Sequence, residues 1–146
     1  MLSDEEIVVR ALHSPFWDAD AKRATPKAFK VVNVSVSRKA ILSFDEIIQI
    51  FRRDLERTNP ATGVVRKVEG AAMVAVSAVN ACVITDKAPT YSVITVADPI
   101  EAAPLIEPNP AHALIQTRRL SDPERLCEMT TGMANSILKA CEIRPL

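Results

Sequence analysis

The stretch VVNVSVSRKAILSFDEIIQIFRRDLER, residues 31–57, decides the fold class, because a strand pattern and a helix pattern follow each other within it. Valine alternates with small polar residues from Val32 to Ser37, the period of two that is typical of a strand with one buried face. Ser43 and Glu46 then fit a capping box, and the apolar positions after them recur every three or four residues. The stretch therefore predicts a strand followed by an amphipathic helix.

Toward the N-terminus the sequence predicts a short helix and a loop. Ser3 and Glu6 repeat the capping-box pattern, and apolar residues follow at helical spacing until about His13. From residue 14 to residue 30, two prolines and the absence of any period predict a structured loop.

Downstream of the central stretch, apolar and proline-rich segments alternate. The run 70–84 fits either a buried strand or a strand followed by a short helix capped at Ser77, and we favour the second interpretation. Residues 91–96 are rich in β-branched residues and predict a strand. Prolines recur from Pro99 onward, so residues 98–110 are expected to form a stiff, extended connector.

The C-terminal part predicts a closing strand at residues 111–116 and then a long helix. Ser121 and Glu124 give an N-cap pattern, and apolar residues recur at helical spacing between residues 122 and 142. Residues 1–146 are thus expected to form a single α+β domain, in which a mixed or mainly antiparallel sheet packs against two or three helices.

The charge balance limits the classes of partner. The chain has 18 Lys+Arg and 18 Asp+Glu residues, so it lacks the strongest signature of a protein that binds nucleic-acid phosphates or acidic lipids. Nucleic acid remains a weaker alternative, because Arg52, Arg53 and Arg57 form a basic edge on the central helix. The N-terminus has no signal-peptide pattern and no apolar run is long enough to cross a bilayer, so we expect a cytoplasmic protein that does not contact a membrane.

The sequence carries no metal or cofactor signature. His13 and His112 are far apart, and neither has a metal-ligand spacing. With only 3 glycines, the chain has neither a P-loop nor a dinucleotide fingerprint, so we expect no metal and no cofactor. Cys82, Cys127 and Cys141 form no C-x-x-C pair. The last two would share the C-terminal helix about 20 Å apart, beyond disulfide reach.

Short motifs between residues 23 and 116 resemble a group of known sequences. They are RATPKAF at residues 23–29, a Val-Ser-Val strand at 34–36, Asp98-Pro99, and PAHALI at 110–115. Together they resemble a loosely defined group of small bacterial proteins with no known activity. The resemblance implies a bacterial cytosolic source and nominates as site positions Arg23, Phe29, Ser35 and His112.

His112 is the first catalytic candidate, since a histidine flanked by alanines at the head of a strand can be held near a cleft, where an imidazole can act as a general acid or base. With Ser35 and either Asp18 or Asp20 it would complete a Ser-His-Asp constellation. The alternative is a structural histidine that donates to a backbone carbonyl.

Arg23 is the second catalytic candidate. With Ser35 and Glu69 it supplies the residue types that ADP-ribose-handling enzymes use to hold a phosphate and steady an oxocarbenium-like centre. The alternative is an arginine that holds a loop in place by bonding a carboxylate or a backbone carbonyl.

The binding candidates are aromatic. Phe16 and Trp17 lie in a proline-bounded loop, as interface anchors do, and Phe29 lies in the RATPKAF motif. Packing against the protein's own core is the alternative for these rings.

No complete catalytic signature is present, so the sequence favours a protein that is not an enzyme. We expect a small cytosolic bacterial protein that acts as a binding or accessory subunit of a larger assembly, with a protein partner or a second copy of itself. The alternative is a small enzyme or toxin-like effector that acts on a nucleotide or nucleic acid, in which Arg23, Ser35 and His112 converge.

Overall fold

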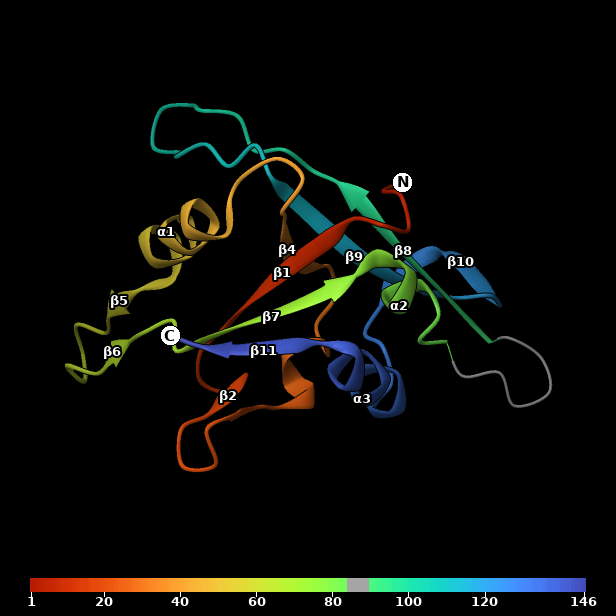
Figure 1. Cartoon of the computed structure of the whole chain (residues 1–146), viewed down its shortest axis with the longest axis horizontal. Helices are drawn as coiled ribbons and strands as arrows, with labels where there is room; N and C mark the ends of the chain where they lie inside the picture. Colours follow the sequence, from red (N-terminus) through yellow and green to blue (C-terminus); the bar gives the residue numbers. More distant parts are fainter. Residues whose placement is uncertain (84–89) are drawn as a thin grey trace.

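The computed structural model describes residues 1–83 and 90–146, and its centre is one antiparallel sheet (Figure 1). The strands of this sheet are β1 (Ile7–Leu12), β4 (Val34–Arg38), β7 (Gly70–Ala75), β8 (Tyr91–Ala97), β9 (His112–Arg119), β10 (Asp122–Cys127) and β11 (Glu142–Pro145). Their order is β10-β9-β4-β1-β7-β11, and β8 also pairs with β9. Every strand pairing within the described ranges is antiparallel.

Helices and two small ribbons surround the sheet. The described residues form the helices α1 (Phe44–Leu55), α2 (Val76–Asn80) and α3 (Thr131–Ala140) and the 3-10 helix η1 (Pro26–Ala28). The two-stranded ribbons pair β2 (Trp17–Asp18) with β3 (Arg23–Ala24) and β5 (Arg57–Thr58) with β6 (Val65–Arg66). The α+β class with a mainly antiparallel sheet is therefore confirmed. No helix in the described part of the chain is long and apolar enough to cross a membrane.

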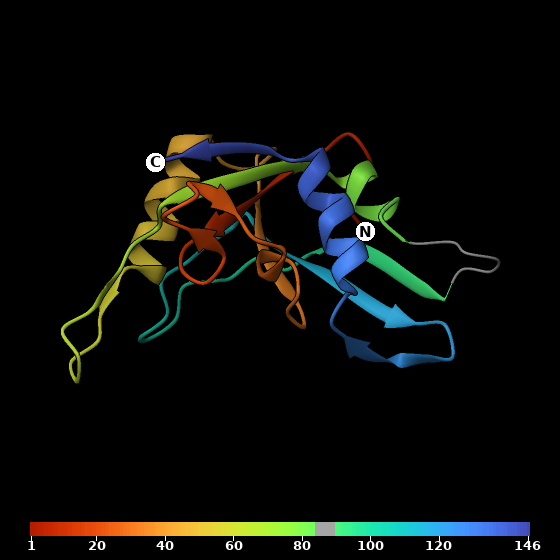
Figure 2. The same ribbon diagram turned by 90° about the horizontal axis from the view of Figure 1, so that it is seen from below.

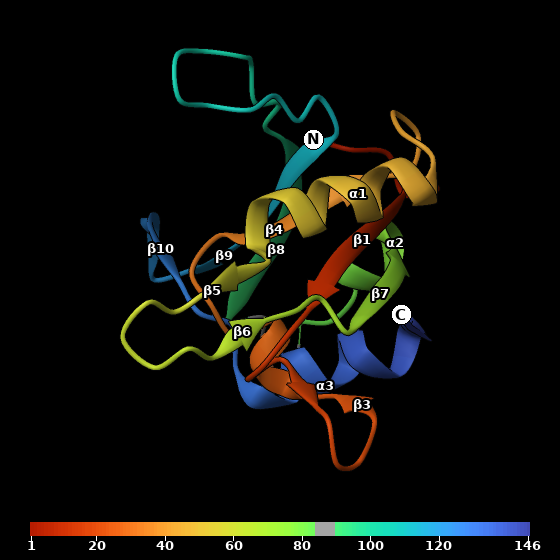
Figure 3. The ribbon, with the colours of Figure 1, turned by 90° about the vertical axis from the view of Figure 1, so that its left-hand side faces the viewer.

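The sheet separates two cores, because successive side chains of a strand point to opposite faces. Helices α1 and α3 lie on opposite sides of it (Figure 3). On the α1 side the core contains Val9 and Ala11 of β1, Ala71 and Met73 of β7, and Ile47, Ile48 and Phe51 of α1. The larger core on the α3 side includes Val8, Leu12, Phe29, Val34, Val36, Met133 and Ile137.

The central stretch folds as its sequence predicts. Val34–Arg38 forms β4, and α1 begins with a complete capping box in which the Ser43 side chain accepts from the Glu46 N–H while the Glu46 carboxylate accepts from the Ser43 N–H. The strands predicted at 91–96 and 111–116 are β8 and β9. The apolar run from residue 70 forms a strand and then a short helix, as we favoured. The N-cap position of α2 is Ala75 rather than Ser77, and no side chain caps the helix. Ile84 lies outside the described residues.

The prediction of an N-terminal helix is wrong, because residues 7–12 form strand β1. Its residues are buried on both faces between β4 and β7, and a run buried on both faces has no period that separates strand from helix. Glu6 caps no helix. Its carboxylate instead accepts hydrogen bonds from the Arg38 Nε at 2.8 Å and from the Arg38 Nη2 at 3.1 Å.

The long C-terminal helix is also a wrong prediction. Residues 122–142 form β10, α3 and the start of β11, and the N-cap is Thr130, whose side chain accepts from the Met133 N–H. Pairing with β9 and β7 draws the two flanks into the sheet, which overrides the helical spacing of their apolar residues. Cys127 lies in β10 and Cys141 follows α3, so they do not share a helix.

Residues 98–110 form a hairpin rather than a stiff connector. Bridges join Ile100 to Asn109 and Ala103 to Ile106, so the segment turns back on itself between Pro104 and Leu105. This Pro-rich hairpin projects away from the sheet (Figures 1 and 2). The prolines favour extended backbone in each arm, and they do not prevent the turn.

The Glu6–Arg38 pair makes stability depend on acidity. The Arg38 hydrogen bond lowers the pKa of Glu6 from its usual 4.5. A carboxylate with a depressed pKa contributes stability above its unfolded-state pKa, and this contribution is lost as the pH falls through the folded-state pKa. We expect Glu6→Gln to reduce the free energy of unfolding by about 0.5–1 kcal/mol near neutral pH, measured by urea unfolding, and to have a smaller effect near pH ~3.

Glu5→Gln is the matched control, because Glu5 is exposed and takes part in no ion pair in the described residues. An equal loss for Glu6→Gln at both pH values would contradict the role of the ion pair.

Candidate functional site

A cavity of about 260 Å³ lies where α1, the sheet and the Pro-rich hairpin meet. Its walls come from segments that are far apart in the sequence. They include Ser35, Ser37 and His112 from the sheet, Phe51 and Asp54 from α1, and Ile100 and Asn109 from the hairpin.

The strand register brings Ser35 and His112 to this cavity. His112 pairs with Ser37 across β9 and β4, and Ser35 precedes Ser37 by two residues, so all three side chains lie on one face of the sheet. That face is covered by α1 over β1 and β7, whose residues make up the α1-side core. The part formed by β4 and β9 lies beside this core, where Ser35 is exposed.

Asp98 orients the His112 ring. The Nδ1 atom of His112 lies 2.9 Å from the Asp98 carbonyl oxygen and 3.1 Å from its Oδ2. With its proton on Nδ1, the ring donates to Asp98 and carries a free lone pair on Nε2. An imidazole held in this way suits a general base, and the same bonds equally suit a histidine that closes the base of the hairpin.

The constellation predicted from the sequence is only partly assembled. The carboxylate beside His112 belongs to Asp98. Asp18 lies in β2, opposite Arg23, and its Oδ1 accepts from the backbone N–H of Asp20 and of Ala21, so this part of the predicted constellation is not at the cavity. No hydrogen bond joins the side chains of Ser35 and His112 in the part of the chain that the structure describes. The sequence did not reveal Asp98 as a partner, because its proximity depends on the pairing of β8 with β9.

Arg23 does not reach the cavity. It lies in β3 directly opposite Asp18 of β2, and its side chain is exposed. Glu69 lines a different hollow, beside the β5–β6 ribbon. The expected convergence of Arg23 with Ser35 and His112, and the grouping of Arg23 with Ser35 and Glu69, are therefore both absent from the described structure.

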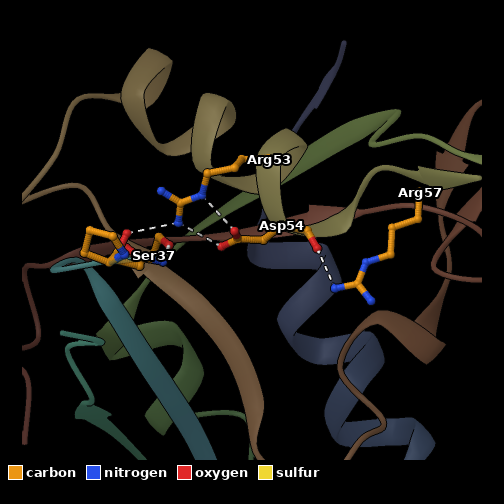
Figure 4. A network of polar contacts seen from close by, with 6 residues as sticks. Ser37, Arg53, Asp54 and Arg57 are labelled. Atoms are coloured by element: carbon orange, nitrogen blue, oxygen red, sulfur yellow. Dashed lines mark hydrogen bonds and ion pairs between the residues drawn. The ribbon is translucent and has the colours of Figure 1, made fainter. Parts of the chain in front are cut away.

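A polar network fastens the hairpin to α1 (Figure 4). Arg53 donates through Nε to the Asp54 Oδ1 at 2.8 Å and through Nη2 to the Pro108 carbonyl oxygen at 3.0 Å. The hydrogen bond to Asp54 raises the pKa of Arg53. On the sheet side, the Asn109 side chain donates to the Ser37 Oγ at 3.5 Å. The base of the hairpin is thus held from two directions.

The aromatic binding candidates pack inside the protein. Phe29 is fully buried, Trp17 is 7% exposed, and both belong to the α3-side core. The Phe16 ring lies beneath the Arg10 guanidinium, whose Cζ is 4.7 Å from the ring centroid. All three rings therefore pack against the protein itself, which was the alternative to a role as interface anchors.

Arg10 is a buried residue that the sequence reasoning missed. Its Nε donates to the Ala28 carbonyl oxygen at 2.9 Å and its Nη1 to that of Ser35 at 3.0 Å. Burial lowers the pKa of Arg10 to about 10, and no carboxylate in the described ranges pairs with it. Arg10 therefore fixes η1 and the Ser35 backbone to β1. The available signal was an arginine inside the apolar run 7–12.

Two of the three cysteines, Cys82 and Cys141, are unsuited to nucleophilic chemistry. All three thiols are free. Burial raises the pKa of Cys82 to about 11 and that of Cys141 to about 12, which disfavours the reactive thiolate. Within residues 1–83 and 90–146, no three His, Cys, Asp or Glu side chains gather as metal ligands would.

Comparison of the chain with protein-family models, with curated proteins and with solved structures finds no match.

The packing of Trp17 makes Gly70 sensitive to substitution. A Cβ at Gly70 would lie 2.8 Å from the Trp17 Cζ3 and 3.0 Å from its Cε3. We expect Gly70→Ala to lower the free energy of unfolding by about 1–3 kcal/mol, because the indole ring must move. Urea unfolding followed by tryptophan fluorescence measures this, since Trp17 is the 1 tryptophan of the chain.

The control is the same substitution in a Trp17→Leu background, followed by circular dichroism. The cost of Gly70→Ala should shrink there, since the ring is gone. An unchanged cost would show that the contact with Trp17 is not the cause.

Proposed function

We propose that the protein is a non-catalytic binding or accessory subunit of a larger protein assembly, and that the tip of the Pro-rich hairpin contacts the partner. The observation that carries this proposal is Leu105, whose side chain is fully exposed at 106% and whose φ is +69°. Ile106 beside it is 52% exposed.

Turn geometry disfavours a leucine at this position. Ala103 and Ile106 exchange two backbone hydrogen bonds, of 3.2 and 2.9 Å, so Pro104 and Leu105 are the two central residues of a tight turn. A proline followed by a residue with positive φ fits a type II turn, in which the second central position favours glycine. A leucine there costs about 1–2 kcal/mol, and exposing its side chain to water returns none of this. Contact with a partner would bury the side chain and offset that cost.

The Pro-rich hairpin is already ordered before any partner binds. Its arms are bridged at Ile100 and Asn109, and its base is bonded to α1 through Arg53 and Pro108. A segment that is already ordered loses less conformational entropy on binding, so its affinity per contact is higher. A bacterial cytoplasmic location is part of the same proposal, and the resemblance of the motifs supports it.

Replacing the leucine tests this proposal. We expect Leu105→Gly to raise the free energy of unfolding by up to about 1 kcal/mol, because relief of the positive φ outweighs the entropy of glycine, and to abolish partner capture. Tagged protein is recovered from its native cells and the bound proteins are quantified. Leu120→Ser is the matched control, since Leu120 is also exposed, at 48%, but lies in the β9–β10 turn.

A stoichiometric partner, or a second copy of the chain, that is retained by wild type and Leu120→Ser and lost from Leu105→Gly supports the proposal. Equal retention by Leu105→Gly contradicts the hairpin contact. A monomer in sedimentation with no stoichiometric partner contradicts the subunit role.

A second candidate is a small enzyme that acts on a nucleotide or nucleic acid. It rests on one observation, the Asp98–His112 pair in a cavity that Ser35 also lines. His112 would act there as a general base, with Asp98 as its positioning residue.

Incubation with labelled RNA and with nucleoside triphosphates tests the second candidate. We expect any turnover to fall about 100-fold or more in His112→Ala, because a general base contributes at least that much to the rate. Arg23→Gln is the control, since Arg23 lies outside the cavity. Turnover that survives in His112→Ala, or no turnover in wild type, counts against catalysis at this site.

A further inference from the structure

The β5–β6 ribbon places two like charges opposite each other. This ribbon projects from the end of α1 (Figures 2 and 3), and its register pairs Arg57 with Arg66. Like charges directly opposite on two strands destabilise the pair. The other small ribbon has the opposite arrangement, because Asp18 lies across from Arg23. The β5–β6 ribbon thus keeps a charge pattern that works against its own folding.

Nearby acidic groups do not neutralise this pattern. None of the ion pairs in the described ranges involves Arg57, Arg66 or Lys67. Arg57 donates through Nη2 to the backbone oxygen of Asp54 at 3.1 Å, while the Asp54 carboxylate already accepts from Arg53 (Figure 4).

Two further carboxylates lie close to the ribbon. The Glu56 carboxylate accepts from the Val68 N–H at 3.1 Å, a hydrogen bond that does not cancel the charge of the carboxylate. Glu56 and the half-buried Glu69 set two negative charges against the three positive charges of the exposed Arg57, Arg66 and Lys67, so one positive charge is left over. The ribbon therefore presents net positive charge to solvent.

These basic side chains surround one hollow. The hollow has a volume of about 610 Å³ and lies between the ribbon and the ends of the sheet strands. Arg57, Arg66 and Lys67 line it together with the hydrogen-bonding side chains of Ser14, Thr58 and Asn59, and Glu69 is the acidic residue of its wall. Guanidinium groups beside hydroxyl and amide donors are the chemistry that recognises phosphate oxygens.

We propose that the β5–β6 ribbon binds the phosphate backbone of duplex DNA. A two-stranded ribbon has the width that the major groove of B-form DNA admits, and basic side chains on both strands would then face phosphates. An extended polyanion fits better than a single small anion, because every residue of β5 and β6 is exposed and basic side chains stand on both strands. This activity uses different residues from the hairpin contact and goes beyond the subunit role.

Fluorescence anisotropy with a labelled duplex of about 20 base pairs tests the proposal on the full chain. We expect Arg57→Gln/Arg66→Gln to weaken binding about tenfold or more and to lower the slope of log affinity against log salt by about 2, one for each lost phosphate contact. The midpoint of thermal unfolding stays the same or rises, because the like charges are gone. A purely structural role for the two arginines would instead lower that midpoint.

Arg23→Gln is the matched control, because it removes one arginine from the other small ribbon and should leave affinity and salt slope unchanged. Arg66→Glu sharpens the test, since a carboxylate opposite Arg57 should stabilise the ribbon and abolish duplex binding.

Three results would overturn the proposal. The first is duplex binding that the double variant leaves unchanged, and the second is a loss of binding that occurs only together with unfolding. The third is saturable binding of inorganic triphosphate or ATP without duplex binding, which would assign the hollow to a small anion. The Arg57→Gln/Arg66→Gln variant leaves the Pro-rich hairpin unchanged, so its capture of a protein partner tests the hairpin contact alone. Failure of DNA binding and failure of the hairpin contact can therefore be told apart.

Discussion

Strand β1 lies between β4 and β7 with both of its faces buried, and this position sets the register of the whole sheet. Since its side chains alternate, Val8 and Leu12 enter the α3-side core while Val9 and Ala11 enter the α1-side core. A slip of one residue would exchange the two sets, so the burial of both faces specifies the pairing strongly. The pairing of β4 with β9, the cavity and the position of α1 all follow from this register.

Arginine side chains hold the irregular segments against the sheet and α1 by donating hydrogen bonds to backbone carbonyl oxygens. Arg10 joins β1 to η1 and to the backbone of β4, and Arg53 joins α1 to Pro108 of the Pro-rich hairpin. A guanidinium group suits this task because it carries several donors in one rigid plane and stays charged at neutral pH. Segments distant in the sequence thereby become walls of one cavity, and the hairpin is held at its base.

Two surface features run against the stability of the isolated chain. Leu105 exposes a large apolar side chain from a turn position that favours glycine, and Arg57 faces Arg66 across a two-stranded ribbon. Residues that cost folding energy and lie on the surface are characteristic of binding sites, because the partner supplies the compensating interaction. The two features belong to separate segments and differ in chemistry, since one is apolar and the other is cationic.

The sequence by itself determined the elements whose signals are local. The capping box of Ser43 and Glu46 and the apolar stripe after it predicted α1, and the valine alternation predicted β4. Only the tertiary structure decided that residues 7–12 form a strand, that residues 122–142 divide into three elements, and that Asp98 lies beside His112. In each of these cases the deciding partner is another strand, and a helical spacing of apolar residues yields where a neighbouring edge offers backbone hydrogen bonds and burial on both faces.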